Sequence, residues 1–474
     1  MIRPKTRPLR RLALLGALVL GATVLLPAGS ANAETKTFTE RVGPITVGGY
    51  EVQQSLLFAP KPPEDGHITA MDVEITDADG TPIPIQRLML HHIVFLNLNR
   101  EDETCKDRQF KMWDNRPAAI GYTPERFYAA GEERAKLILP PGYGYAMKSS
   151  DRWTMAYMVM NHRAATDSAY IQYRVTYETG ASDADTRDVT PYWLDVRNCS
   201  ADPIYNVPGT DGRGSTHRET YDYVLPEGGR IVAAGGHVHG GGKRLTLTQP
   251  GCGNRLLGRS TPTWGLPSHA FYNVRPVLHE PGPINMSGFG TATGIPIAAG
   301  ERVRLSSLYD NDRPHTRVMG IMVMFVDHDP AVSGRCGPLP NDIAYLSTDQ
   351  PGRHGIVPFR IPLTGLDANG NAITIEKPPG RNARLGNGAT IRVGDRFFSK
   401  PNVVVERGAR LRWLFDGIEL HNLTLANGPV GIGSPNLDDS RAYSRRFGRP
   451  GTYNFFCALH PVQMHQRVVV KPTR

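Results

Sequence analysis

The sequence has little of what a helical, membrane-embedded or nucleic-acid-binding protein needs. Long stretches with helical periodicity are absent from its 474 residues, which argues against a helical bundle. After residue 33 no apolar run reaches membrane-spanning length, so we expect no membrane span once residues 1–33 are removed. The net charge is +9, but five basic residues precede residue 34, and the remaining +4 forms no basic run with interleaved aromatics. No nucleic-acid partner is therefore expected.

The first 33 residues have the pattern of an export signal. Basic residues from Arg3 to Arg11 precede an apolar stretch over 12–26, and Ala31-Asn32-Ala33 is a small-x-small cleavage site. The pair Arg10-Arg11 leaves open whether export follows the general or the twin-arginine route. We expect a signal peptide over 1–33 and a secreted or extracytoplasmic protein, at the cell surface or in a periplasm.

Cysteine is scarce, and its count is odd: Cys105, Cys199, Cys252, Cys336 and Cys457. Disulfides persist in exported proteins, and an odd count leaves one thiol for another role. Pairing of neighbours suggests the disulfides Cys105–Cys199 and Cys252–Cys336, with the two other connectivities of these cysteines left open. Cys457 is then free to bind a metal.

The 50 glycines and 39 prolines indicate many turns, which is typical of all-β proteins. Strand-like runs recur at 68–75, 92–98, 170–177, 244–248, 302–308, 319–326, 402–406 and 410–415. The best helix candidate is 125–137. The sequence therefore predicts an all-β fold with two jelly-roll-like β-sandwich domains over 34–200 and 201–335, a linker over 336–390, and a small terminal domain over 391–474.

The terminal domain carries a set of soft metal ligands. Cys457, His460 and Met464 follow a strand-like run over 451–456, and His421 lies upstream. Two imidazoles, a thiolate and a weak axial thioether are the ligands of a blue-copper site. Zinc is the rival metal, but its usual ligands are Cys, His and carboxylates rather than Met. A buried free cysteine with surface histidines is the other alternative.

With the segments 399–408 and 410–415, these residues make the terminal domain resemble the plastocyanin/azurin family of cupredoxins. The resemblance implies a Greek-key β-sandwich in which His421, Cys457, His460 and Met464 bind a type 1 copper. Three residues separate His460 from Met464, one fewer than in plastocyanin. Phe456 and Ala458 flank Cys457 where multicopper oxidases have histidines, which favours an electron carrier.

Three groups of histidines and one methionine stand out before the terminal domain. His91 and His92 open an apolar strand, and His162 ends another. Adjacent histidines can serve one metal only at a strand end or a bulge. His237 and His239 lie among glycines and would share one face of an extended strand. Met319 lies on a methionine-rich strand, where core packing is the usual role.

The part of the chain before the linker, residues 34–335, is called the body below. With these residues in this order, the body resembles the copper type II, ascorbate-dependent monooxygenases, typified by the peptidylglycine and dopamine hydroxylating enzymes. That resemblance implies two β-domains, each holding one copper, with a solvent-filled gap between them. It assigns an electron-transfer copper to three histidines and the catalytic, oxygen-activating copper to two histidines and a methionine. The respective ligands are His91, His92 and His162, and His237, His239 and Met319. Gly235 stands where the peptidylglycine enzyme has an arginine, so a peptidylglycine substrate is unsupported.

The expected function is that of a secreted copper-dependent monooxygenase-like oxidoreductase with up to three coppers, one type 1 and two mononuclear and type 2-like. Electrons would be relayed to the oxygen-activating copper by the three-histidine copper and the blue-copper domain. The substrate, a small molecule or a peptide, is not identified, and an external electron donor is expected. The alternatives are a non-catalytic copper-binding or electron-transfer protein and an adhesion module with vestigial histidines.

The remaining histidines show no ligand pattern, and we expect them to be surface or hydrogen-bonding residues: His67, His217, His269, His279, His328 and His354. His315 lies near Met319 and is a candidate for a group that supports a ligand from behind.

Overall fold

The computed structural model describes residues 34–473 apart from 107, 114–115, 181–182, 201, 347–355 and 358. The predicted signal peptide lies outside these residues. The described part is built from strands, with three short 3-10 helices: η1 (Asp183–Asp185), η2 (Pro250–Cys252) and η3 (Ala270–Tyr272). Within it, no helix has the length and apolar character needed to span a membrane. The predicted all-β fold class is confirmed.

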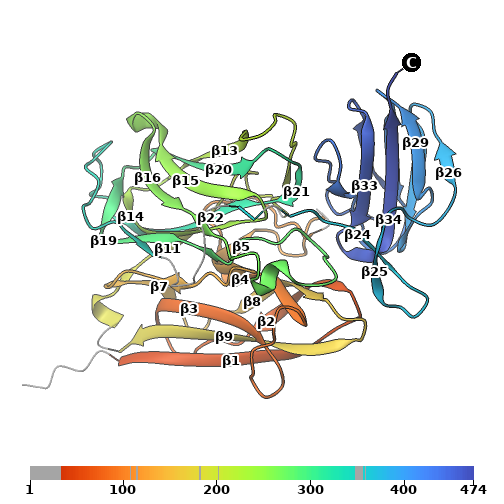
Figure 1. Ribbon diagram of the computed structural model, residues 1–474. Helices are drawn as coiled ribbons and strands as arrows, with labels where there is room; N and C mark the ends of the chain where they lie inside the picture. Colours follow the sequence, from red (N-terminus) through yellow and green to blue (C-terminus); the bar gives the residue numbers. More distant parts are fainter. Residues whose placement is uncertain are drawn as a thin grey trace, which may run out of the picture. The chain divides into compact units, whose positions relative to one another are not determined.

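Two sheets form the first sandwich (Figure 1). Its strands are β1 (Glu34–Val47), β2 (Val52–Ala59), β3 (Gly66–Thr76), β4 (Leu88–Glu101), β5 (Pro124–Gly131), β6 (Leu137–Ile138), β7 (Tyr143–Met147), β8 (Trp153–Asn161), β9 (Asp167–Thr179) and β10 (Arg187–Asp188). One sheet has the order β1-β9-β3-β7-β10 with β6 on β3, and the other has β2-β8-β4-β5. Along β9 alternate residues from Ala169 to Tyr177 are buried, because side chains of a strand alternate between its faces.

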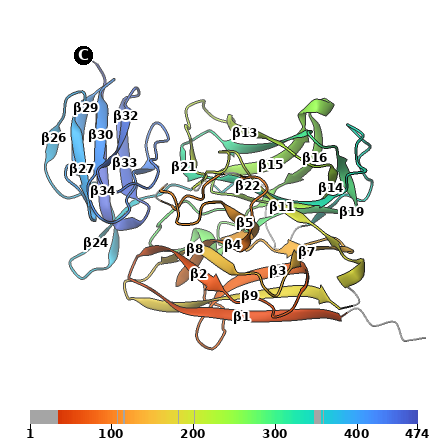
Figure 2. The same cartoon turned by 180° about the vertical axis from the view of Figure 1, so that it is seen from behind.

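The second sandwich follows in the chain (Figure 2). Its strands are β11 (Thr190–Asp195), β13 (Thr216–Val224), β14 (Gly229–Val238), β15 (Gly242–Gln249), β16 (Arg255–Ser260), β19 (Gly288–Ile297), β20 (Arg302–Asp310), β22 (Gly320–His328) and β23 (Ala344–Leu346). They form the sheets β11-β22-β14-β19-β23 and β13-β20-β15-β16. Strand β5 contacts β11 and β22, so the sheets that carry the candidate ligands of the two sandwiches face each other.

Short strand pairs connect these layers. They are β12 (Tyr205–Val207) with β21 (His315–Val318), β17 (Pro262–Thr263) with β18 (Asn285–Met286), and β24 (Leu363–Leu366) with β25 (Ala372–Ile375). β23, β24, β25 and β26 (Asn382–Arg384) lie inside the predicted linker 336–390, so this segment has secondary structure of its own. The domain boundaries themselves stay a prediction.

The third sandwich, at the C-terminal end, is drawn in blue in Figure 1. Its strands are β26 (Asn382–Arg384), β27 (Thr390–Gly394), β28 (Phe397–Phe398), β29 (Asn402–Glu406), β30 (Arg410–Phe415), β31 (Thr424–Asn427), β32 (Arg441–Arg446), β33 (Gly451–Cys457) and β34 (His460–Lys471). Their sheets are β26-β29-β34-β33-β31 and β28-β27-β30-β32. Trp413 is fully buried between them and donates a hydrogen bond from Nε1 to Oε1 of Gln466, at 2.7 Å, which satisfies its polar atom.

Both neighbour-paired disulfides, Cys105–Cys199 and Cys252–Cys336, are confirmed, and Cys457 is a buried free cysteine. The helix predicted over 125–137 is wrong. Pro124 to Gly131 form strand β5, which pairs with β4 and is buried along nearly its whole length. Partnering by β4 outweighs the weak helix propensity of this segment.

Strand β5 also buries a carboxyl group whose ionisation should make stability depend on pH. Glu125 accepts a 2.5 Å hydrogen bond from the Tyr145 hydroxyl and lies 3.8 Å from Arg100. Burial raises its pKa from 4.5 to about 7. Between these values the folded protein keeps a proton that the unfolded chain has released, so the free energy of unfolding falls as pH rises through this window.

Glu125→Gln should remove this pH dependence. Relative to the wild type, the variant should gain about 3 kcal/mol of unfolding free energy between pH 5 and pH 8, at 1.36 kcal/mol per pKa unit. Urea unfolding at several pH values measures this gain. The exposed Glu376 provides the control, Glu376→Gln, whose stability difference should not change with pH. Parallel pH curves for Glu125→Gln and the wild type would contradict the prediction.

Candidate metal centres

A thiol and two imidazoles converge at the end of β33. Sγ of Cys457 lies 3.9 Å from Nδ1 of His421 and 3.7 Å from Nδ1 of His460. Cys457 and His421 are fully buried, and the imidazole centroids are 4.8 Å apart. The described residues 421, 457 and 460 thus offer three ligand atoms to one metal ion.

The outer nitrogen of each imidazole has a carboxylate partner. Nε2 of His421 lies 3.3 Å from Asp395, and Nε2 of His460 lies 3.2 Å from Glu419. Such partners orient metal-binding imidazoles and make them more basic. The Asn422 amide donates to the Cys457 sulfur at 3.4 Å. Burial raises the pKa of the Cys457 thiol, so binding of a metal would have to release its proton.

Met464 is fully buried in the same apolar core as Cys457. The pairing of β33 with β34 shifts register between Phe456 and Cys457, since Phe456 faces His465 while Cys457 faces His460. The chain between the two pairs bulges, and Met464 is the last residue of that bulge. This places Met464 at the same end of the ladder as Cys457, as its predicted axial role requires.

A bulge also occurs where the adjacent histidines require one. In the β4–β8 ladder the register shifts between Leu90 and His92, so His91 is the extra residue. Nδ1 of His91 and Nδ1 of His92 lie 3.0 Å apart, so both rings turn to the same side of the strand. His162 directly follows β8, and its Nδ1 lies 3.1 Å from the Pro276 carbonyl oxygen.

The two ligand sets of the body lie side by side. The His91 ring centroid is 5.2 Å from that of His92, 5.4 Å from that of His239 and 4.9 Å from that of His279. His237 lies 5.0 Å from His239 by the same measure. The resemblance implies a gap between two separate centres, whereas here His91 contacts the opposite set directly.

His237 and His239, called the HxH pair below, present nitrogen atoms that lack hydrogen-bond partners. Nε2 of His237 and Nε2 of His239 are both buried and unpartnered. Nδ1 of His237 lies 3.1 Å from Glu133, and the Arg317 backbone interacts electrostatically with the His239 ring. Burial lowers the pKa of His239 well below its ordinary value, which favours the neutral, ligand-competent imidazole. For His237 burial acts in the same direction, but the Glu133 carboxylate reverses it and the pKa is raised.

Met319 lies between β21 and β22 rather than within a strand. Tyr309 fixes its position, because the Tyr309 hydroxyl donates to the Met319 carbonyl at 2.6 Å and accepts from the His239 amide at 2.7 Å. Met319, His92 and His237 line one cavity of about 650 Å³ between the first two sandwiches. The cavity brings the predicted methionine ligand to the same space as His237, whereas His239 does not line it.

Sequence reasoning missed His279 and the acidic pair that follows β5. His279 is not a surface residue: its Nε2 lies 3.2 Å from Glu132, and His91, Glu132 and His279 are close enough to hold one metal ion. Glu133 supports His237. A run of three charged residues, Glu132 to Arg134, directly after an apolar segment was the available signal.

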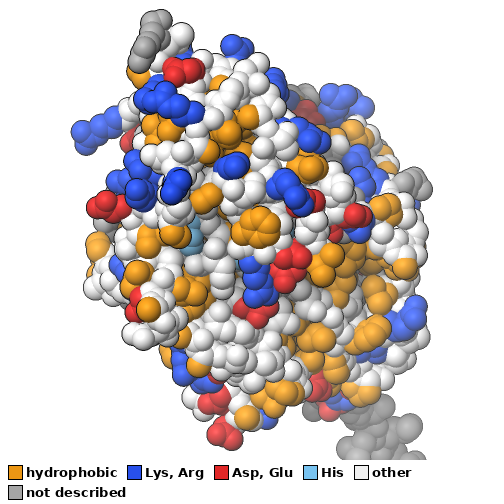
Figure 3. Space-filling view, turned by 90° about the vertical axis from the view of Figure 1, so that its right-hand side faces the viewer, with side chains coloured by type: hydrophobic (Ala, Val, Ile, Leu, Met, Phe, Trp, Pro, Cys, Tyr) orange, Lys and Arg blue, Asp and Glu red, His pale blue; other side chains and the backbone are white. Residues whose placement is uncertain are grey.

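The other histidines have ordinary partners. His67 pairs with Asp183, His217 with Glu219, and His328 with Tyr192, while His269 caps η3. His354 lies outside the described residues. His315 is buried and lies 3.0 Å from Glu280, directly under the turn at Gly241. Little histidine surface is visible on the face in Figure 3, in keeping with the burial of the candidate ligands.

Comparison with known proteins gives the third sandwich a clear relative. Amicyanin-alpha of Methylorubrum extorquens is 30% identical over 84 residues, which are 17% of this chain and 70% of that protein. The cupredoxin part of the chain belongs to the amicyanin family. A purple cupredoxin from Nitrosopumilus maritimus is 24% identical in the matched part, which covers 18% of this chain and 99% of that one at a TM-score of 0.17.

Other similarities concern the body. A family model described as "Stress up-regulated Nod 19" matches residues 194–329. A probable copper-dependent oxygenase of a Phoma species is 24% identical over 257 residues, which are 52% of this chain. This chain spans 57% of the length of that relative. The narrower resemblance to the peptidylglycine enzymes stays a prediction.

Proposed function

We propose that the protein is a secreted copper-dependent oxidoreductase of the monooxygenase type, with an amicyanin-like domain that supplies electrons. His237, His239 and Met319 would hold the oxygen-activating copper, and a histidine set around His91 would hold the electron-transfer copper. Bound copper would supply the one-electron chemistry and the oxygen activation that side chains lack. The relatives named copper-dependent oxygenases and amicyanins support this proposal.

The observation that carries the proposal is the pair of unpartnered Nε2 atoms of His237 and His239. Buried polar atoms almost always have partners, so two such atoms on imidazoles whose centroids lie 5.0 Å apart point to a missing ligand. Two imidazoles and a thioether form a soft donor set, which suits Cu(I), and binding of the metal at His237 would release any proton that Glu133 stabilises there. Glu133 holds the His237 ring from behind, as carboxylates do for metal-bound histidines.

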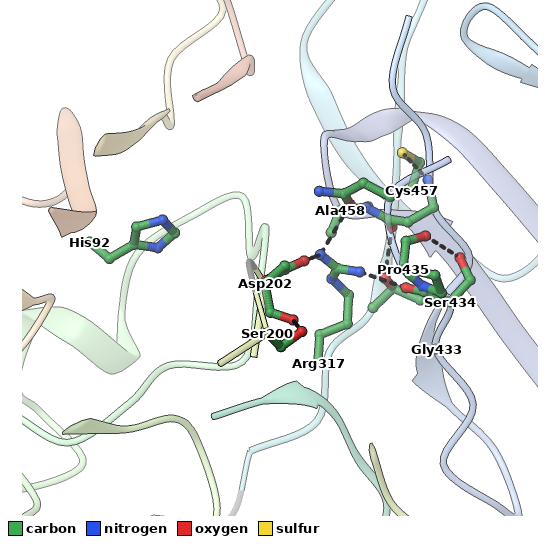
Figure 4. Close-up of polar contacts among 12 residues, drawn as sticks. His92, Ser200, Asp202, Arg317, Gly433, Ser434, Pro435, Cys457 and Ala458 are labelled. Atoms are coloured by element: carbon green, nitrogen blue, oxygen red, sulfur yellow. Dashed lines mark hydrogen bonds and ion pairs between the residues drawn. The ribbon is translucent and has the colours of Figure 1, made fainter. Parts of the chain in front are cut away.

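A chain of polar contacts from the blue-copper ligand Cys457 to His239 supports the relay. The Asn422 amide donates to the Cys457 sulfur, and the Asn422 side chain donates to Oδ1 of Asn436 at 2.9 Å. Nη2 of Arg317 donates to the same Oδ1 at 3.1 Å, and the Arg317 backbone interacts electrostatically with the His239 ring. Figure 4 shows Arg317 between Asp202 and the loop of Ser434 and Pro435. These contacts lead to His239 rather than to the predicted three-histidine set.

The cavity is the candidate substrate site. Its volume of about 650 Å³ suits a small molecule or the end of a peptide. Side chains such as Phe127, Trp193 and Phe325 make much of its lining apolar. Gly235 lines it where a substrate-binding arginine would be needed for a peptide carboxylate. An apolar substrate therefore fits this cavity better than a charged one.

Replacement of Met319 tests the catalytic role. In the copper-loaded protein with an excess of reductant, Met319→Leu should lower oxygen consumption about 10- to 100-fold, because the thioether that favours Cu(I) is lost. An oxygen electrode measures the rate. Met322→Leu is the matched control, since Met322 is fully buried in the core of the second sandwich and does not line the cavity. A wild-type protein that binds copper in the body but consumes no oxygen would instead be an electron-transfer protein.

A further inference from the structure

We propose that His91, Glu132 and His279 form a copper(II) site of two imidazoles and one carboxylate, next to the HxH pair. The choice of copper rests on the proposed function, whereas the ligand set rests on the geometry alone. This set differs from the three histidines that the resemblance implies, since His279 and Glu132 enter it and His92 faces the cavity instead.

Three separate parts of the fold bring these ligands together. His91 comes from the bulge of β4, Glu132 from the turn after β5, and His279 from the loop after η3. One ligand atom from each lies within 4.8 Å of the others. The Gly282 amide donates to Glu132 at 2.8 Å, which ties the His279 loop to the end of β5.

The burial of Glu132 points to a cation. The residue is 3% exposed, and the adjacent Glu133 is equally buried. A buried carboxylate is costly unless it is paired or coordinates a metal. Glu133 lies against His237, whose pKa it raises, and Arg134 interacts with both carboxylates. Beside Glu132, in contrast, lie the imidazoles of His91 and His279, the latter with Nε2 3.2 Å from the carboxylate.

Two further nitrogen atoms face the same region without partners. Nδ1 of His279 and Nε2 of His162 are buried and form no hydrogen bond. His162 is 4% exposed, and it interacts electrostatically with His279. The Pro276 carbonyl orients His162 from the same loop that carries His279. His162 thus borders the site through His279 but is not one of the three ligands that lie within 4.8 Å of one another.

The ligand chemistry distinguishes this site from its neighbour. A carboxylate is a hard donor and favours copper(II), whereas the thioether of Met319 is soft and favours copper(I). Among divalent first-row metals, sites of nitrogen and oxygen ligands bind copper most tightly. The body thus contains one site that favours copper(II) next to one that favours copper(I). An electron is therefore more stable on copper at the Met319 site.

Copper titration of the full-length, metal-stripped protein tests the inference. Copper content by mass spectrometry and the copper(II) electron paramagnetic resonance spectrum should show that His279→Ala and Glu132→Gln each weaken one body copper about 10- to 100-fold. The blue band should be unchanged. Glu132→Gln keeps the shape of the side chain, so it remains informative if His279→Ala fails to fold. His217→Ala, on β13 and paired with Glu219, is the control and should bind copper like the wild type.

Unchanged copper content and an unchanged spectrum in both variants would overturn the inference, as would stronger binding of zinc than of copper in competition. These outcomes differ from failure of the proposed function, in which copper is bound normally but oxygen is not consumed. Suppose that Glu132→Gln loses the copper(II) signal and the wild type consumes no oxygen. The metal site would then be supported, and the proposed oxygenase activity would be contradicted.

Discussion

Cys457→Ser should lose the intense blue absorption of the copper-loaded protein entirely and slow the reduction of the body copper. The absorption of a type 1 site depends on a thiolate ligand, which a serine hydroxyl cannot replace. The hydroxyl is close to isosteric, and His421 and His460 keep their carboxylate partners, so the third sandwich should still fold. Stopped-flow spectroscopy with a reduced donor protein measures both effects.

Met464→Leu is the control for this experiment. It removes a predicted axial ligand but keeps the thiolate, so the band should persist with a changed reduction potential. Body copper reduced as fast in Cys457→Ser as in the wild type would show that electrons bypass the amicyanin-like domain. The oxygenase proposal would survive that result, but the relay would not.

Arg317→Ala should destabilise the protein by about 3–5 kcal/mol, the usual cost of removing one partner from a buried ion pair. Nη2 of Arg317 lies 3.0 Å from Asp202, and the two side chains are 11% and 9% exposed. Nη1 also donates to the Ser434 carbonyl at 2.6 Å, so the same guanidinium holds the third sandwich (Figure 4). The φ angle of Arg317 is +55°, a left-handed conformation that these contacts maintain.

The loss of stability in Arg317→Ala should grow as the pH rises. Burial raises the pKa of Asp202 even though the Arg317 guanidinium lies beside it. When Arg317 is replaced, the Asp202 carboxyl group can avoid a buried charge only by keeping its proton. The free energy of unfolding of the variant should thus be closest to that of the wild type at acidic pH and should differ most from it above pH 7. Urea unfolding measures stability, and hydrogen exchange at Ser434 to Asn436 reports on docking.

Asp202→Asn combined with Arg317→Ala is the matched control, because it removes the unpaired carboxylate. The double variant should recover part of the stability, yet exchange near Asn436 should remain fast since the guanidinium is still missing. Equal stability of the single and double variants at every pH would contradict the buried-charge explanation.

Several features could be read from the sequence because each depends on local chemistry. Short strand-like runs between turn signals predicted β3, β9, β15, β20, β29 and β30, and the odd number of cysteines isolated Cys457. The spacing of Cys457, His460 and Met464 on one short segment indicated a shared metal before the third sandwich was seen. The adjacent pair His91 and His92 could serve one metal only at a strand end or a bulge, and the ladder of β4 has a bulge there.

The errors share a physical cause. Treating 125–137 as a helix would place Glu132 and Glu133 on a solvated surface, whereas the end of strand β5 buries them beside His92. Propensity within a segment contains no information about which strand will pair with it. His279 escaped notice because no residue near it in the sequence is a metal ligand, and its partners are 147 and 188 positions away.

The chain's composition and motif spacing were sufficient for an all-β protein, its two disulfides and the ligand types of its candidate centres, because these depend on residue chemistry and short-range periodicity. The packing of β5 against β11 and β22 decided which ligands meet, since only contact between distant sheets brings His91 beside His239. The same packing buried Glu132 next to His279 and created the cavity at Met319.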